Sequence, residues 1–337
     1  MQLKRCATVR RMPPSIAVAA VFLPVTADQA ARKPSIQLAH RSNWNEKAKI
    51  MTIANKRTAA LFDAAEFTDF EHQGWQQNAV GWHQHFEAVS TQAVGALLDA
   101  VDIVSNRSNR GRRLLDVATG PGYATGAAAL RGADGYGVDF SSAQIELARR
   151  QFPDVCFDVS DAENLPFEDG AFDAVVINFG LQHFAHPERA LHEAYRVLRP
   201  GGRIAFTVWA SPPRAVGFEI VQRAIAAHGD PNADIPAGPS YYRFADPSES
   251  RRTLALAGFK AVRVTEVAQT WRVGDPDQVL IAIADGTVRA GALFRAQSPS
   301  ARCAIAVAVR DAVQAYRQDR AIELPMPAVL SSATKLI

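Results

Sequence analysis

The chain is poor in cysteine, in net charge and in long hydrophobic runs. Its three cysteines, Cys6, Cys156 and Cys303, are far apart and form no CxxC pair, so their spacing indicates neither a disulfide framework nor a zinc site. No metal ligand set is therefore expected, and a reducing, cytoplasmic setting fits this cysteine usage best. Cys156 lies in the apolar run VCFDV and is predicted to be a core residue.

The small charge excess argues against nucleic acid as a partner. The formal net charge is +3 over 337 residues, and no basic surface interleaved with aromatic residues is visible in the sequence. With 48% hydrophobic residues, the chain has enough material for one large core or two smaller ones. We therefore expect a small molecule as partner and no stable insertion into a membrane; the oligomeric state is left open.

Residues 1–50 differ from the rest of the chain. They are rich in Lys and Arg, and their apolar stretch, IAVAAVFLPVTA at 16–27, is interrupted by Pro24 and too short to span a bilayer. Three interpretations stay open: a disordered leader ahead of a natural start at Met51, a secretory signal, or an organellar transit peptide. The leader is favoured, because nothing downstream calls for export.

A helical segment is predicted next, followed by alternating strands and helices. Apolar residues from about 55 to 105 recur at steps of three and four, and His83 and His85 are expected to be polar positions on this amphipathic helix. Strands are predicted near 113–118, 135–139, 155–159, 172–178 and 203–209, with helices near 123–131, 142–151 and 187–198. The stretches AVRVTEVAQTW and AVLSSATKL supply two further strands.

This order predicts an α/β fold: a Rossmann-like, doubly wound, mostly parallel seven-stranded sheet with helices on both faces. The expected organisation is a leader at 1–50, a helical segment at 51–110, a Rossmann-like core at 111–211, and a lid, a helical insertion and the last strands at 212–337. Ligands of such sheets bind at the carboxyl ends of the strands. Asp139, Asp161 and Asn178 each follow a predicted strand and should meet at that edge.

The stretch LLDVATGPGYAT at 114–125 reads as strand, tight loop and helix. Gly120 and Gly122 would let the backbone approach a ligand closely. Asp139, 17 residues after Gly122, sits where a carboxylate can accept hydrogen bonds from a ribose. These features predict a cofactor that carries a nucleoside.

A nicotinamide dinucleotide is the weaker choice of cofactor. Its fingerprint needs GxGxxG, whereas this loop has Thr125 at the third glycine. Asp116 at the end of the first strand favours a methyl donor with an amino-acid end, because a carboxylate attracts its ammonium group. An oxidoreductase that uses nicotinamide stays open as the less favoured alternative.

Four stretches in this order and spacing resemble class I S-adenosylmethionine-dependent methyltransferases, specifically the type 11 branch that contains the ubiquinone and menaquinone methyltransferases. They are LLDVATGPG, GVDFS, SDAENLPFEDGAFDAVVINFGLQHF and EAYRVLRPGGRIAF. The resemblance covers about residues 60–337 in architecture and 113–209 in motif detail. It implies S-adenosyl-L-methionine as cofactor and methyl transfer as the reaction. The apolar residues of the C-terminal part predict a small, apolar or aromatic acceptor.

The resemblance also implies roles for single residues around the cofactor. Asp139 would bind the ribose hydroxyls, and Phe140 would lie against the adenine. The adenine amino edge would meet Asp161 and Ala162, and Asn178 would line the pocket near the methionine moiety. The methionine portion would be held by the glycine loop and the acid before it: Asp116, Ala118, Thr119, Gly120 and Gly122.

Ala118 departs from the family loop, which is usually DxGxGxG. Because alanine adds a single methyl group, we expect a small local adjustment of the loop and not a loss of binding.

The chemistry needs little from the protein, because the sulfonium is already activated and in-line displacement mainly requires positioning. A general base is needed only for a hydroxyl or an acidic carbon as acceptor, and His183 in NFGLQHF is the best-placed residue. A loop histidine that bonds backbone is the competing interpretation. A non-catalytic protein that binds the cofactor also stays open.

Substrate choice is expected in the C-terminal part. The segment 210–250, with Tyr241, Tyr242 and Phe244, is predicted to form a lid, followed by a capped helix that ends at Gly258. The helical insertion at 276–320 has two interpretations: packing against the sheet and lid, or a wall for an apolar acceptor. It carries the apolar residues Leu280, Ile281, Ile283, Leu293, Phe294, Ile305, Val307 and Val309.

Overall fold

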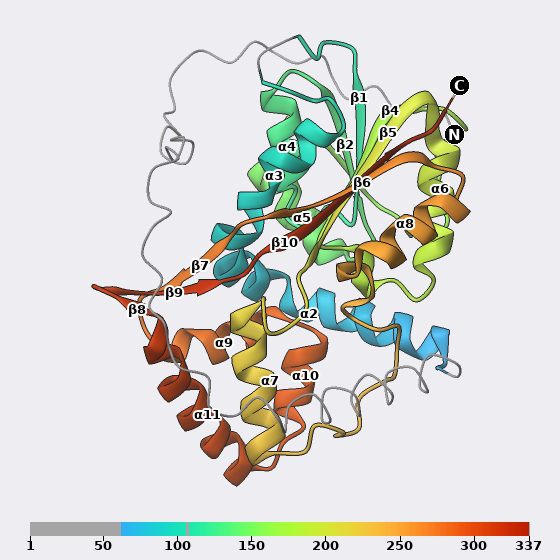
Figure 1. Ribbon diagram of the computed structural model, residues 1–337. Helices are drawn as coiled ribbons and strands as arrows, with labels where there is room; N and C mark the ends of the chain where they lie inside the picture. Colours follow the sequence, from blue (N-terminus) through green and yellow to red (C-terminus); the bar gives the residue numbers. More distant parts are fainter. Residues whose placement is uncertain (1–61, 106–107, 337) are drawn as a thin grey trace.

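A seven-stranded sheet forms the centre of the protein in the computed structural model, which describes residues 62–105 and 108–336 (Figure 1). The strand order is β3-β2-β1-β4-β5-β10-β6. All neighbours pair in parallel except β10, which is antiparallel to both β5 and β6. The predicted fold class is confirmed. The strands are β1 (Arg113–Val117), β2 (Asp134–Asp139), β3 (Cys156–Val159), β4 (Phe172–Asn178), β5 (Leu198–Trp209), β6 (Lys260–Val267) and β10 (Ala328–Thr334).

Helices cover both faces of this sheet, as expected for a doubly wound fold (Figure 1). One face carries α3 (Val94–Ala100), α4 (Tyr123–Leu130) and α5 (Ser142–Gln151). The other carries α6 (Pro187–Val197), which begins with proline in its first turn, and α8 (Pro247–Leu256), capped by the side chain of Asp246. The three core helices predicted from sequence are confirmed to within one residue at each end.

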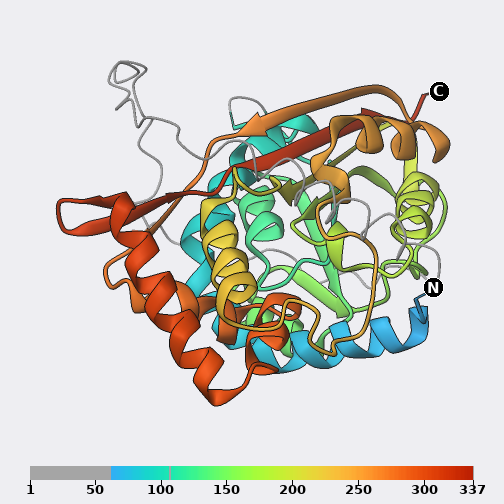
Figure 2. The same ribbon diagram turned by 60° about the horizontal axis from the view of Figure 1, so that its bottom comes forward.

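The long helix α2 (Ala64–Ser90) crosses below the carboxyl ends of the strands (Figure 1, Figure 2). Asp63 caps it, because its carboxylate accepts hydrogen bonds from the backbone N–H groups of Ala65 and Glu66. A short 3-10 turn, η1 (Thr91–Ala93), joins it to α3. The predicted leader at 1–50 and the start of the predicted helical segment lie outside the described residues.

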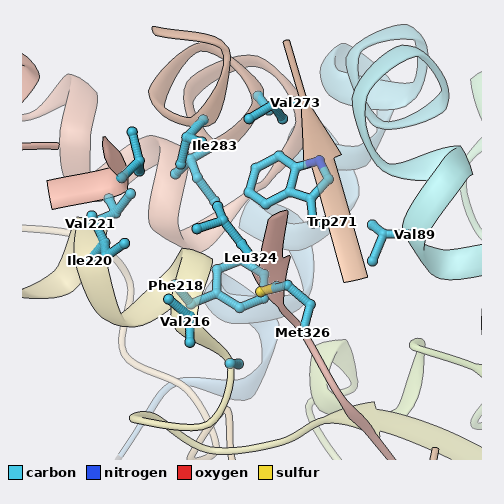
Figure 3. Close-up of a cluster of buried hydrophobic side chains, with 14 of the residues drawn as sticks. Val89, Val216, Phe218, Ile220, Val221, Trp271, Val273, Ile283, Leu324 and Met326 are labelled. Atoms are coloured by element: carbon cyan, nitrogen blue, oxygen red, sulfur yellow. The ribbon is translucent and has the colours of Figure 1, made fainter. Parts of the chain in front are cut away.

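A second layer of helices lies beside α2: α7 (Val216–His228), α9 (Asp277–Gly286), α10 (Arg289–Arg295) and α11 (Pro299–Val313) (Figure 2). Their apolar side chains form one buried cluster with α2 (Figure 3). Within it the ring of Phe86 lies 5.1 Å from Trp271 and 6.4 Å from Phe218, measured between ring centroids. Leu280, Ile283, Ile305 and Val309 of the predicted insertion are buried in this cluster, which favours the packing interpretation.

The predicted sixth strand is wrong at its end. AVRVTEVAQTW was expected to be one strand, but β6 stops at Val267 and Trp271 belongs to β7 (Thr270–Val273). That strand joins β9 (Ala321–Pro325) and β8 (Arg317–Gln318) in a separate three-stranded sheet. Gln269 redirects the chain between the two strands, since its amide nitrogen donates to the carbonyl of Val89 on α2 at 2.5 Å.

Cys156 also differs from its expected place. It is half-buried at the start of β3 and takes part in a disulfide bond, so the prediction of a simple core thiol is wrong. Cys303 is exposed and free. In the described part of the chain, no helix is both long and apolar enough to cross a membrane.

Gly81 sets the close crossing of α2 and α9. A Cβ at this position would overlap the backbone carbonyl of Asp285, closer than real Cβ contacts occur. Gly95, in α3, has more room, because the nearest atom to a Cβ there would be Arg131 Nη2 at 3.7 Å. Gly81 is therefore a suitable position to test this crossing, and Gly95 is its matched control.

Gly81→Ala should lower the free energy of unfolding by about 1–3 kcal/mol, because the helices must move apart or strain. Gly95→Ala should raise it or leave it unchanged, by up to about 1 kcal/mol, because alanine has the higher helix propensity. Urea unfolding of both variants followed by circular dichroism measures the difference. Equal stability of the two variants would contradict this account of the α2–α9 crossing.

Candidate functional site: a pocket between the strand ends and helix α2

A pocket of about 950 Å³, part of it open to solvent, lies at the carboxyl ends of β1, β2 and β4, with α2 on its other side. Most of the residues predicted from sequence line it, namely Ala118, Thr119, Gly120, Asp139, Phe140, Asp161, Ala162, Asn178 and His183. Asp116 and Gly122 are not among the lining residues.

Asp116 lies directly behind the glycine loop and is 1% exposed. Its Oδ2 accepts hydrogen bonds from the hydroxyls of Thr119 and Thr125, both at 2.7 Å, and from the Thr125 backbone N–H at 3.1 Å. Its Oδ1 has no partner among the described residues. Burial raises the pKa of this carboxyl from 3.8 to about 6, although the hydrogen bonds act in the opposite direction. Asp116 thus holds the loop in shape.

Asp139 ties the glycine loop to the end of β2. Its Oδ2 accepts from the backbone N–H of Gly120 and its Oδ1 from that of Ser141, both at 2.9 Å. The side chain is 6% exposed, and burial raises its pKa from 3.8 to about 6. Two backbone loops are therefore fixed by one carboxylate that borders the pocket.

Ala118 adopts the left-handed backbone conformation, with φ of 54°, which favours glycine. Its Cβ is accommodated because Gly180 faces it: a Cβ on Gly180 would lie 2.6 Å from that of Ala118. Gly120, with φ of 54° as well, has only Gln144 Oε1 near a Cβ, at 3.9 Å. The loop therefore leaves open space at Gly120, on the pocket side.

Hydrogen bonds within the protein hold two further predicted residues, Asn178 and Asp161. Asn178 accepts from the hydroxyl of Thr207 at 2.7 Å and donates to the carbonyl of Ser90 at 3.4 Å. Asp161 accepts from the backbone N–H of Glu163 at 2.8 Å, which shapes the loop after β3. Each side chain thus has a defined position on the pocket wall.

Helix α2 supplies residues that the sequence motifs did not indicate. Gln76 joins it to the start of α5, because its Oε1 accepts from the Ser141 hydroxyl at 2.7 Å and the Ala143 backbone N–H at 2.9 Å. The ring of His72 lies 5.3 Å from that of Phe140. Trp75 and Trp82 line the pocket, with their rings 5.5 Å apart in an edge-to-face arrangement. These contacts make α2 the outer wall of the site.

His183 is enclosed by this wall and by Tyr241 of the segment between α7 and α8. Its Nδ1 lies 3.0 Å from Oε2 of Glu71, a residue on α2 with 0% exposure. The rings of Trp75 and Tyr241 lie 5.0 Å and 5.5 Å from its imidazole, both edge-to-face. The interpretation of His183 as a loop histidine bonded to backbone is therefore not what the structure shows.

A signal for Glu71 exists in the sequence. Phe67, Glu71, Trp75, Trp82 and Phe86 are separated by four, four, seven and four residues and so share one face of a helix. A carboxylate on an otherwise apolar face is costly unless it is paired. Glu71 could therefore have been identified as a buried functional candidate, although its partner could not.

His83 and His85, the remaining histidines of α2, lie away from the pair of Glu71 and His183. His83 contacts the hydroxyl of Tyr123 at 2.5 Å and does not line the pocket. His85 borders a shallower surface pocket beside Asp285 and Arg295. Within residues 62–105 and 108–336, no group of three or more His, Cys, Asp or Glu side chains could hold a metal ion.

The two buried carboxyls predict a dependence of stability on pH. Their folded-state pKa values of about 6 exceed the ordinary value near 4. Between about pH 4 and about pH 6, the folded protein therefore binds more protons than the unfolded chain. Their contribution to the free energy of unfolding therefore falls as pH rises from about 4 to about 6. In Asp139→Asn, the decrease in the free energy of unfolding over this pH range should be smaller by roughly 1–3 kcal/mol.

Urea unfolding of the ligand-free protein at about pH 4.5 and about pH 7 measures this difference. Asp134→Asn is the control, because that side chain is exposed at the start of the same strand. If the free energy of unfolding decreased between these pH values as much in Asp139→Asn as in the unchanged protein, Asp139 would have no raised pKa.

Comparison with known proteins agrees with these motifs. A family model described as "Methyltransferase domain" matches residues 115–206. The demethylmenaquinone methyltransferase of Clavibacter sepedonicus is 40% identical over 122 residues, which are 34% of this chain and 50% of that protein. The chain thus spans about half the length of this relative.

A second relative is matched over more of its length. The demethylmenaquinone methyltransferase of Streptomyces griseus is 31% identical over 180 residues, which are 51% of this chain and 75% of that protein. Among solved structures, phosphoethanolamine N-methyltransferase 2 of Haemonchus contortus in complex with S-adenosyl-L-methionine aligns with a TM-score of 0.49 and 18% identity, over 80% of this chain and 60% of that one. The two sequence matches and the domain match show that the chain belongs to the class I S-adenosylmethionine-dependent methyltransferases, in the type 11 branch that contains the demethylmenaquinone methyltransferases.

Proposed function

We propose that this protein transfers a methyl group from S-adenosyl-L-methionine to a small aromatic acceptor bound in the same pocket. One observation carries the proposal: a single pocket joins the cofactor motif at the strand ends with an aromatic wall that holds His183. Cofactor and acceptor must meet in one water-poor space for in-line displacement, and this pocket offers both halves.

The residues present fit the cofactor. The loop has open space at Gly120, and Oε1 of Gln144, a residue that lines the pocket, is buried without a partner among the described residues. Such an oxygen gains from a ligand that brings hydrogen-bond donors or positive charge. S-adenosyl-L-methionine has both, in its ammonium group and its ribose hydroxyls, and when bound it supplies a methyl group on a positively charged sulfur.

Roles follow from where the side chains lie. Asp139 would accept from the ribose hydroxyls, and Phe140, held by His72, would lie against the adenine. Asp161 and Ala162 would meet the adenine edge. The loop at 118–122 and Asn178 would face the methionine portion, with Asp116 acting through the loop that it organises.

The acceptor would occupy the part of the pocket next to α2. Trp75 and Trp82 would form an aromatic wall beside the acceptor, and the hydrogen-bonded pair of Glu71 and His183 would be its polar contact. A planar ring suits such walls, because aromatic pairs gain stability beyond the area they bury. The names of the relatives, demethylmenaquinone methyltransferases, support a quinone-type ring as the acceptor.

Calorimetric titration of the full chain tests the cofactor. We expect S-adenosyl-L-methionine to bind in the micromolar range and NADH not to bind. Asp139→Asn should weaken binding by about 10- to 100-fold, because it removes a charged acceptor whose hydrogen bonds contribute about 1.5–3 kcal/mol. Asp134→Asn should bind as the unchanged protein does. Binding of NADH alone would reject the proposed cofactor.

Turnover of a hydroxylated ring tests His183. With 1,4-dihydroxynaphthalene as probe, His183→Asn should lower kcat by about 10²- to 10⁴-fold, because a positioned base is lost. Affinity for S-adenosyl-L-methionine should not change. His192→Asn, an exposed position on α6, is the control. Formation of S-adenosylhomocysteine, followed by chromatography, gives the rates; an unchanged kcat in His183→Asn would exclude the residue from the reaction.

A further inference from the structure

Glu71 is a buried carboxylate whose place the cofactor motifs do not explain. It lies in the middle of α2 with 0% exposure. One oxygen, Oε2, is 3.0 Å from Nδ1 of His183, and the other, Oε1, has no hydrogen-bond partner among the described residues. Burying a carboxylate with one unsatisfied oxygen is costly, so the presence of Glu71 at this place calls for a reason.

The contact fixes how His183 can carry its proton. An ionised carboxylate only accepts hydrogen bonds, so the proton of a neutral imidazole must sit on Nδ1, where it can be donated to Glu71. Nε2 then keeps its lone pair. If Nε2 takes up a proton, the resulting imidazolium is stabilised by the negative charge 3.0 Å away. This is the arrangement in which a carboxylate and a histidine act together as a base.

The surrounding rings hold the imidazole in place. Trp75 approaches it from α2 and Tyr241 from the segment between α7 and α8, with ring centroids at 5.0 Å and 5.5 Å. The side chain of His183 is only 11% exposed, yet the residue lines the pocket. A histidine so enclosed keeps one orientation, which a proton acceptor needs.

We infer that Glu71, in its ionised form, is a positioning residue that keeps the proton of neutral His183 on Nδ1 and leaves Nε2 free to take a proton from the acceptor. The inference rests on the proposed function and adds a residue to its site. A hydroxylated ring such as the probe 1,4-dihydroxynaphthalene needs a base of this kind.

The step balances in atoms and electrons. Nε2 of His183 takes the hydroxyl proton, and the electron pair left on the acceptor forms the new bond to the methyl carbon, at oxygen or at a ring carbon conjugated with it. The bond between the methyl carbon and the sulfur of S-adenosyl-L-methionine breaks. Its electron pair stays on sulfur, which becomes a neutral thioether. After methylation at oxygen, His183 returns its proton to solvent. After methylation at a ring carbon, the hydrogen on that carbon leaves as a proton, the ring becomes aromatic again, and its oxygen takes back the proton held by His183.

Several charged or titratable groups act on His183 from the elements around it. Glu71 on α2 is in direct contact, and the carboxylate of Asp139 after β2 interacts with the imidazole through space. His72 on α2 acts on the same Asp139. From the other side come Tyr241 and, lying over its ring at 5.7 Å, the guanidinium of Arg289 on α10. Among the residues that the structure describes, only Glu71 lies within hydrogen-bond distance of an imidazole nitrogen of His183.

Steady-state kinetics with Glu71→Gln is the first test, because glutamine keeps the shape and removes the charge. With 1,4-dihydroxynaphthalene, kcat should fall at least about tenfold, and the pH at which kcat reaches half its maximum should move down. The KM for S-adenosyl-L-methionine should not change. Glu66→Gln, an exposed carboxylate on the same helix, should behave as the unchanged protein. An unchanged kcat and pH profile in Glu71→Gln would overturn the inference.

Nitrogen-15 NMR of the histidine side chains is the second test, and it needs no acceptor. In the unchanged protein the neutral form of His183 should carry its proton on Nδ1; the spectrum of His183→Asn identifies the signal. In Glu71→Gln this preference should weaken or reverse. A proton on Nε2 in the unchanged protein would overturn the inference, whatever the probe shows. Failure of the unchanged protein to bind S-adenosyl-L-methionine would instead reject the proposed function and leave the NMR result to decide the role of Glu71.

Discussion

The carboxylate of Asp139 is the point on which the rest of the site depends. It holds the backbone of Gly120 on one side and of Ser141 on the other, so the loop after β1 and the start of α5 are fixed relative to each other. Ser141 in turn bonds Gln76, which extends the same network to α2. Because the carboxylate is buried, its charge is costly in the free protein, and a ligand that brings donors or positive charge offsets that cost.

The pocket therefore has two halves with different origins. The strand ends give a polar half, built on backbone loops and on Asp116 and Asp139, that suits a nucleoside. Helix α2 gives an aromatic half with Glu71 and His183 as its polar point. Gly81 lets α2 lie close enough to α9 to stay in this position, so the helical layer around the insertion supports the site without lining it.

The sequence predicts the polar half well and the aromatic half poorly. The strands and loops of the proposed cofactor site are local features: the glycines, Asp116 and Asp139 occur within about 25 residues and lie at or directly after strand ends. The pairing of Glu71 with His183 joins residues 112 positions apart, and no local pattern encodes it. The same reason explains the missed break after β6, where Gln269 bonds a carbonyl 180 positions away. Trp75 and Trp82 could be predicted as buried, but not as the wall of a pocket.

The central claim is that one pocket holds both the cofactor and the acceptor. A crystal structure of the full chain with S-adenosylhomocysteine and 1,4-dihydroxynaphthalene tests it most directly. The account predicts that the ribose lies at Asp139, that the sulfur faces the space beside Trp75, and that a hydroxyl of the ring lies within hydrogen-bond distance of His183. Binding of the ring outside this pocket, or of the nucleoside away from Asp139, would contradict it.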